Sequence, residues 1–201
     1  MEQNKEYIRL AADLQSDSIV DGPGLRTVIW TQGCNHHCKG CQNPQTWSFK
    51  GGGLVPIKEV LKEIDKLEYQ SGVTFSGGDP MYQPYACEKI AKYAKKKGLN
   101  IWVYTGFTYE ELIDMSKSDS IYLEFLKNID VLVDGKFILE ERDLSLLFRG
   151  SRNQRLIDVQ KTLETGEISL LNEYEYMEEK ARGRSAPPLP GGRRPPPPPC
   201  A

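Results

Sequence analysis

The chain has 201 residues and a mass of 22.8 kDa, a length that suits one domain, with room for at most a small second one. Its 26 basic and 28 acidic residues give a net charge of −2, so charge offers no reason to expect nucleic acid or an anionic membrane as the main partner. Hydrophobic residues make up 39% of the chain, and no apolar run is long enough for a membrane span or a secretory signal, so we expect a folded cytoplasmic protein.

Strand-like and helix-like segments alternate along most of the chain. Apolar runs predict strands at residues 25–32, 72–75, 101–104 and 129–133. Apolar residues at helical spacing predict helices at 56–69 and 84–97, the second with Cys87, Ile90, Ala91 and Ala94 on its apolar face. Thr108, with Glu111 three residues later, predicts the capped start of a third helix. This alternation predicts an α/β fold with parallel strands and outer helices.

Glycine and polar residues follow each predicted strand. In parallel sheets and barrels, ligands gather where the strands end. We therefore expect one site built from four strand ends, namely Gly33-Cys34, Ser76-Gly77-Gly78-Asp79, Thr105-Gly106 and Asp134-Gly135-Lys136. By contrast, Arg26 at the start of the first of these strands is interpreted as a charge at a strand edge, and Trp30 and Phe75 as residues that pack the sheet.

The C-terminal part has a different composition. Residues 182–201 are rich in Gly, Arg and Pro and contain eight of the thirteen prolines, so they cannot build a core and favour extended conformations. A ligand for an SH3-type domain and an extension foreign to the fold are both open interpretations of this segment. We predict a domain at residues 1–171 and a tail at 172–201, first charged and then proline-rich.

Three of the five cysteines lie within eight residues, at Cys34, Cys38 and Cys41. An odd, clustered set indicates metal binding or redox chemistry rather than disulfides. A structural zinc site needs four ligands and would have to recruit His36, His37 or a distant residue. A [4Fe–4S] cluster would use the three thiolates and leave one iron open to a small molecule. The spacing alone does not separate these alternatives.

The order of motifs resembles that of the radical S-adenosylmethionine (SAM) superfamily. The resemblance rests on the Cys-x3-Cys-x2-Cys spacing after one strand and on Gly77-Gly78-Asp79-Pro80 after the next, with Asp where the superfamily more often has Glu. It implies a partial (βα) barrel in which Cys34, Cys38 and Cys41 hold a [4Fe–4S] cluster. It also implies that SAM chelates the fourth iron and that Gly77, Gly78 and Asp79 meet the SAM amino group.

Further segments narrow the resemblance to the glycyl-radical-enzyme activating enzymes. Residues 18–26 resemble their opening motif, and Tyr104-Thr105-Gly106-Phe107 resembles their next strand end, which assigns Thr105 to the cofactor site. Asp134-Gly135-Lys136 resembles an Asp-x-Lys element in which the Asp contacts the SAM ribose and the Lys its carboxylate. Residues 150–159 resemble a motif of the subfamily that activates anaerobic ribonucleotide reductases, and Asn153, Gln154 and Arg155 within it could shape either the SAM site or a docking surface.

The resemblance implies a reaction and two partners. Reductive cleavage of SAM would yield a 5′-deoxyadenosyl radical that takes a hydrogen atom from a glycine of the catalytic subunit of anaerobic ribonucleotide reductase, with a flavodoxin or ferredoxin as reductant. Two alternatives remain open: activation of another glycyl radical enzyme, such as pyruvate formate-lyase, and a zinc-binding interaction module without catalysis.

Overall fold

Four parallel strands form the centre of the fold in the computed structural model, which describes residues 6–181. They are β3 (Arg26–Thr31), β5 (Gly72–Gly77), β6 (Asn100–Tyr104) and β7 (Val131–Asp134), side by side in that order. Each is an apolar, largely buried segment, and the connections between them carry helices, as parallel pairing requires. The predicted parallel core is confirmed.

Antiparallel strands that were not predicted extend this parallel core into a mixed sheet. The described residues form nine strands, and those flanking the parallel core are antiparallel: β1 (Tyr7–Leu10), β2 (Gln15–Ser18), β4 (Gly53–Pro56), β8 (Arg155–Asp158) and β9 (Ser169–Leu170). Between β7 and β8 the chain forms no α-helix, so β8 returns antiparallel to its neighbour.

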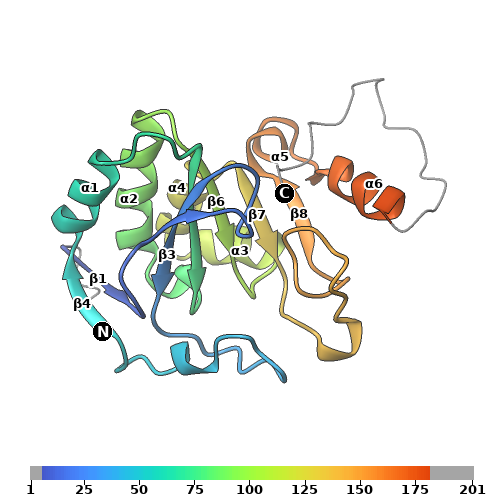
Figure 1. Cartoon of the computed structure of the whole chain (residues 1–201), viewed down its shortest axis with the longest axis horizontal. Helices are drawn as coiled ribbons and strands as arrows, with labels where there is room; N and C mark the ends of the chain where they lie inside the picture. Colours follow the sequence, from blue (N-terminus) through green and yellow to red (C-terminus); the bar gives the residue numbers. More distant parts are fainter. Residues whose placement is uncertain (1–5, 182–201) are drawn as a thin grey trace.

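Five helices cover one face of the sheet (Figure 1). They are α1 (Ile57–Asp65), α2 (Pro84–Lys96), α3 (Tyr109–Ser116), α4 (Ile121–Leu126) and α5 (Val159–Thr165). The predicted face of α2, including Cys87, is fully buried, and the predicted capping box begins α3. The first helix ends at Asp65, short of residue 69, because backbone N–H groups of Lys66 and Leu67 close the last turn on Glu63 and Ile64.

The opposite face of the sheet is covered by loops and by the last helix. Trp102, Val131 and Val133 point to this face and form a second apolar cluster with Phe148 and Tyr174. Tyr174 belongs to α6 (Asn172–Ala181). Figure 1 shows α6 at the right of the molecule, on the other side of the sheet from α1 and α2. Thus α6, inside the segment predicted as a tail, packs on the rest of the fold. The proline-rich residues 182–201 lie outside the described residues.

Arg26 lies inside this second face, which corrects its interpretation as an edge charge. The side chain is 1% exposed and donates hydrogen bonds to Thr74 Oγ1 (2.7 Å) and to the carbonyl oxygens of Val73 (2.9 Å) and Asn100 (3.0 Å). Its guanidinium lies 5.5 Å from the centroid of the Trp102 ring. Burial lowers the pKa of Arg26 to about 10.

None of the helices described between residues 6 and 181 combines the length and the apolar character needed to cross a membrane.

Candidate iron–sulfur site

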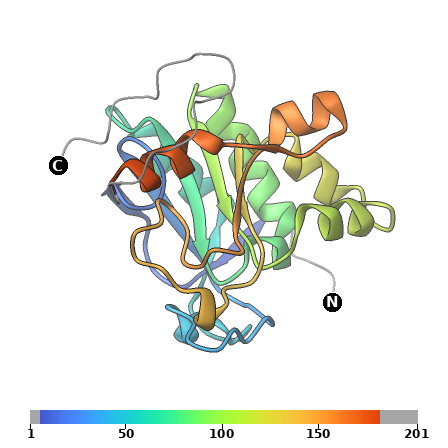
Figure 2. The same ribbon diagram turned by 90° about the vertical axis from the view of Figure 1, so that its right-hand side faces the viewer.

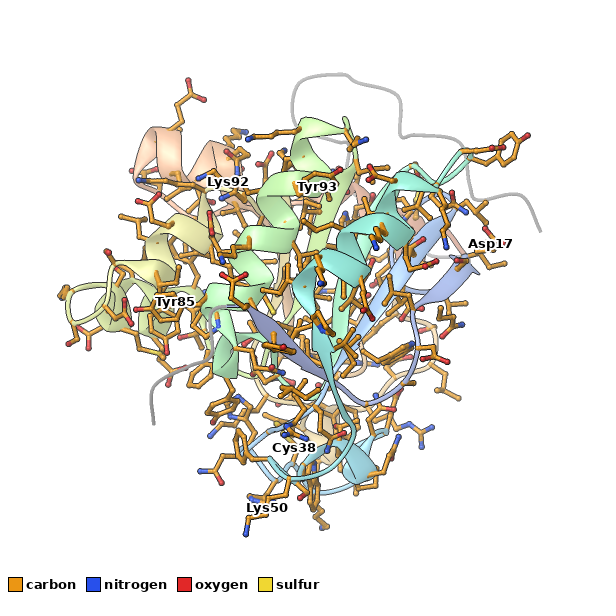
Figure 3. All side chains as sticks on the ribbon, turned by 90° about the vertical axis from the view of Figure 1, so that its left-hand side faces the viewer. Asp17, Cys38, Lys50, Tyr85, Lys92 and Tyr93 are labelled. Carbon is orange, nitrogen blue, oxygen red and sulfur yellow. The ribbon has the colours of Figure 1, made fainter. Side chains whose placement is uncertain are left out.

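The loop after β3 carries the three clustered cysteines beyond the end of the sheet. Figure 3 shows Cys38 at the lower end of the molecule, opposite the end of α2 that carries Lys92 and Tyr93. Backbone hydrogen bonds from Gly33 N to Thr46 O (2.8 Å) and from Cys34 N to Trp47 O (3.1 Å) turn the loop back on itself. Residues 44–46 form a short 3-10 helix that begins at a proline. The loop is therefore held at both ends by main-chain contacts.

All three cysteines line one cavity of about 430 Å³, a volume in the range of small-molecule sites. Each is partly buried and carries a free thiol. Burial is the main cause that raises the pKa of Cys34, to about 11, and it also raises the pKa of Cys38. A positively charged metal centre favours thiolates and would offset this cost.

The indole of Trp47 adds a polar group to this wall. Its Nε1–H is buried and has no hydrogen-bond partner among the described residues, although Trp47 lines the cavity. An unpaired buried N–H is uncommon in folded proteins, and sulfur is a weak acceptor for such a donor. Three thiols and an unpaired N–H donor on the wall of one cavity have the donor chemistry that an iron–sulfur cluster requires.

Neither histidine of the loop is directed to the cysteines. His36 Nε2 lies 2.7 Å from Asp79 Oδ2, and its side chain is 7% exposed. His37 is exposed and packs its ring edge-on against Trp47, at 4.8 Å between centroids. Within residues 6–181 no three His, Cys, Asp or Glu side chains are grouped so that they could hold a single metal ion.

The end of β5 meets the cysteine loop through its two glycines. A Cβ on Gly77 would lie 2.8 Å from Thr31 O, and one on Gly78 would lie 2.6 Å from Gly33 O. This approach allows hydrogen bonds from Gly78 N to Thr31 O (2.7 Å) and from Asp79 N to Gly33 O (3.0 Å). The two glycines are therefore needed for close contact between two segments of the chain. The sequence alone predicts them only as residues of the cofactor site.

Asp79 and Thr105 join the next strand end to this turn. Asp79 begins a 3-10 helix (Pro80–Tyr82), and its Oδ1 accepts from Met81 N at 2.9 Å. Its carboxylate also accepts from Thr105 Oγ1 (3.0 and 2.9 Å) and from Gly106 N (2.9 Å). Like Gly77, Gly78 and the cysteines, Asp79 and Thr105 line the cavity, so the structure brings seven of the nine predicted site residues together.

The other two predicted residues, Asp134 and Lys136, do not line the cavity, although Gly135 between them does. Asp134 is 1% exposed, accepts from Arg155 Nε (2.9 Å) and Nη2 (2.5 Å), and also accepts from Tyr109 N (2.8 Å). Lys136 is exposed, and its carbonyl oxygen accepts from Asn153 Nδ2 (2.7 Å). The structure therefore directs Asp134 toward α3 and away from the cysteines.

Several lining residues were not predicted for this site. Trp30, expected to pack the sheet, lines the cavity and donates from Nε1 to Gln15 Oε1 (3.1 Å), whereas Phe75 is buried in the core as expected. The loop after β7 supplies Leu144, Leu146, Phe148 and Arg149. Figure 2 shows this loop and the cysteine loop at the same lower end, and Lys39 pairs with Glu140 between them (3.2 Å).

Arg149 is held in the wall by a residue from the segment predicted as a tail. Its Nη2 lies 2.8 Å from Glu178 Oε2 on α6, and the two side chains are 6% and 4% exposed. Glu178 Oε1 also accepts from Leu147 N (2.6 Å). The sequence alone assigns this helix to the tail because its residues are rich in charge and lie directly before the Pro- and Gly-rich residues 182–201.

Comparisons with known proteins identify the family of the chain. The family described as "4Fe-4S single cluster domain" matches residues 20–157, which span the cysteine loop and all four parallel strands. The chain therefore belongs to the class of proteins with such a domain. The chain is 37% identical over 145 residues to the "Anaerobic ribonucleoside-triphosphate reductase-activating protein" of Haemophilus influenzae, covering 68% of this chain and 89% of the relative. The proteins of the same name from Vibrio cholerae and Escherichia coli are 38% and 35% identical, over 68% of this chain and 89% and 90% of theirs.

The chain therefore belongs to the family of anaerobic ribonucleoside-triphosphate reductase-activating proteins. Among solved structures, QueE from Escherichia coli overlaps 51% of this chain and 53% of its own, with a TM-score of 0.42 and 16% sequence identity.

Proposed function

We propose that this chain forms a glycyl radical on the catalytic subunit of an anaerobic ribonucleoside-triphosphate reductase, using SAM at a [4Fe–4S] cluster. Two findings support the proposal: the family to which the chain belongs, and the convergence of three cysteines with the Gly77–Asp79 turn on one cavity. The second observation carries it, because a cluster with three protein ligands needs an adjacent place for the molecule that completes it.

In this proposal the chain holds and positions groups, and the bound cofactors supply the difficult chemistry. Cys34, Cys38 and Cys41 hold the cluster as thiolates. The Gly77–Asp79 turn and Thr105 hold SAM against it. When bound, the cluster and SAM would supply a carbon radical and release methionine at the expense of one electron from the external reductant, and this radical would accept a hydrogen atom from a glycine Cα of the partner.

The other parts of the site exclude water and admit the partner. The aromatic side chains of Trp30, Phe137 and Phe148 line the same cavity as the cysteines. A dry site protects a reactive radical from side reactions. We assign Asp134 to the support of the site through Arg155 and leave the SAM contacts of Asp134 and Lys136 as predictions from the resemblance.

The proposal also includes the setting of the reaction. The reductant is a flavodoxin or ferredoxin, the compartment is the cytoplasm, and the sheet is part of a partial barrel whose domain extends beyond the predicted boundary at residue 171 to include α6. The organisation of β3, β5, β6 and β7 with their helices on one face supports the barrel assignment.

The test uses anaerobically isolated protein. We expect a brown protein with about four irons per chain, and a glycyl radical in the electron paramagnetic resonance (EPR) spectrum when the reduced protein and SAM meet the reductase subunit. Cys38→Ala should abolish radical formation and leave the fold intact, because the loop lies outside the core. Cys87→Ala is the matched control, since Cys87 is buried in the core and does not line the cavity.

Two outcomes would contradict the proposal. A colourless protein that holds one zinc ion would favour the interaction module. A radical on pyruvate formate-lyase with none on the reductase would assign the chain to another glycyl radical enzyme.

A further inference from the structure

His36 is the side chain of the cysteine loop that enters the fold. Its ring is enclosed by Phe107, at 4.6 Å between centroids in an edge-to-face arrangement, and by Tyr82 at 5.8 Å. Both neighbours lie just beyond strand ends, Tyr82 after β5 and Phe107 after β6. The imidazole is 7% exposed, although the rest of the loop is largely exposed. The side chain of His36 is therefore packed into the fold and not solvated.

The carboxylate of Asp79 explains why a histidine occupies this position. Four protein groups donate to it: Met81 N, Thr105 Oγ1, Gly106 N and His36 Nε2. Three of them lie in the segments that follow β5 and β6, and His36 alone among the four comes from the cysteine loop. Because a carboxylate only accepts hydrogen bonds, Nε2 carries the proton in this 2.7 Å contact.

Gly106 provides independent evidence that the fold reserves space for this ring. A Cβ at residue 106 would lie 2.5 Å from His36 Cδ2 and 2.7 Å from its Nε2. The backbone conformation of Gly106 does not require glycine, since its φ is outside the left-handed region. The absence of a side chain at this position therefore serves the close approach of the imidazole.

We propose that His36 is a positioning residue that sets the cysteine loop at a fixed place relative to the turn that binds SAM. The inference rests on the proposed function and deepens it. Asp79 then acts through its contacts with the protein: it ties the ends of β5 and β6 together and holds His36. The three cysteines share the loop of His36, so this hydrogen bond and ring pocket add to the backbone contact between Asp79 N and Gly33 O in aligning the cluster with the SAM site.

The experiment compares His36→Ala, His36→Gln and His37→Ala after anaerobic reconstitution. His37 is the matched control, since it is the neighbouring histidine and is exposed without contact to Asp79. Three quantities are measured: iron and sulfide content, the dissociation constant of SAM, and the change that SAM causes in the EPR g-values of the reduced cluster. The g-values report the geometry at the cluster, which a purely structural role of His36 would leave unchanged.

We expect His36→Ala to keep its cluster, to bind SAM at least about tenfold more weakly, and to show an altered g-value response to SAM. His36→Gln keeps an N–H that can reach Asp79 and should recover most of the affinity. His37→Ala should stay within about twofold of the unmodified protein. Gly106→Ala gives a second route, because its Cβ displaces the ring without removing the histidine, and it should weaken SAM binding in the same way.

Three results would overturn the inference. The first is SAM binding by His36→Ala and Gly106→Ala equal to that of the unmodified protein. The second is loss of the cluster in His36→Ala, which would make the histidine a requirement for cluster retention. The third is coupling of a histidine nitrogen to the cluster in pulsed EPR. If the unmodified protein holds no cluster, the proposed function fails with the inference; if it holds one and binds SAM, the inference alone is judged.

Discussion

The contact between Gly78 and the cysteine loop gives a quantitative prediction. In Gly78→Ala the new methyl group would lie 2.6 Å from Gly33 O, 2.9 Å from Gly33 N and 3.0 Å from Thr31 O. All three are backbone atoms, so no side chain can rotate to relieve the overlap. The end of β5 and the start of the loop must move apart, and the hydrogen bonds Gly78 N to Thr31 O and Asp79 N to Gly33 O are then lost or lengthened.

The magnitude follows from those two hydrogen bonds. Each contributes about 0.5–1.5 kcal/mol net, so Gly78→Ala should lower the free energy of unfolding by about 1–3 kcal/mol. For a protein of this size that corresponds to a fall in Tm of about 2–12 °C. Gly98→Ala is a matched control: Gly98 has φ +82° and no heavy atom within 4 Å of a Cβ, so the change costs about 1–2 kcal/mol of backbone strain far from the site.

The assay separates stability from cluster binding. Thermal unfolding of the metal-free proteins should show similar losses for Gly78→Ala and Gly98→Ala. After reconstitution, iron and sulfide content should fall to less than half in Gly78→Ala and stay unchanged in Gly98→Ala. An unaltered Tm and full iron content in Gly78→Ala would refute the argument that this approach of two backbones sets the loop.

Two further predictions concern the supports of the site. Arg155→Met leaves the buried Asp134 without its cation, so we expect the free energy of unfolding to fall by about 3 kcal/mol and Tm to fall by about 6–12 °C. Lys136→Met, at the same strand end but exposed, should leave Tm unchanged. Equal Tm values for the two variants would be inconsistent with a buried charge. Thr108→Ala removes the side-chain cap of α3 and should lower the free energy of unfolding, measured in urea, by about 0.5–2 kcal/mol. Ser120→Ala, at an N-cap without a side-chain hydrogen bond, should lower it by less than about 0.5 kcal/mol. A larger effect at Ser120 than at Thr108 would show that capping is not the cause.

The sequence predicts the centre of the fold better than its edges, for a physical reason. The strands at residues 72–77 and 100–104 each contain a short, mostly apolar and buried stretch, and such stretches are recognisable in the sequence alone. Gln15–Ser18 contains no apolar residue, and Gly53–Pro56 contains both glycine and proline. These segments become strands because β1 and β3 offer them partners, and pairing of this kind depends on the tertiary fold.

The same distinction applies to the site. The three cysteines are recognised because their spacing is local. The contacts that position them are not: His36 and Asp79 are 43 residues apart, and Arg149 and Glu178 are 29 apart. Nothing in the local pattern around His36 distinguishes it from His37, and the fold alone gives one a buried partner and the other solvent. The contact between His36 and Asp79 depends on β3 and β5 lying side by side, which the sequence alone does not show.

The pair of Arg149 and Glu178 has a consequence for the order in which the molecule is made. Chains emerge from the ribosome with the N-terminal part first, so the cysteine loop is synthesised early. One wall of the cavity depends on the loop after β7, and that loop is held by a carboxylate on the last described helix. A nascent chain therefore carries its three clustered thiols well before the enclosure around them is complete, and this enclosure can form only after α6 has been synthesised.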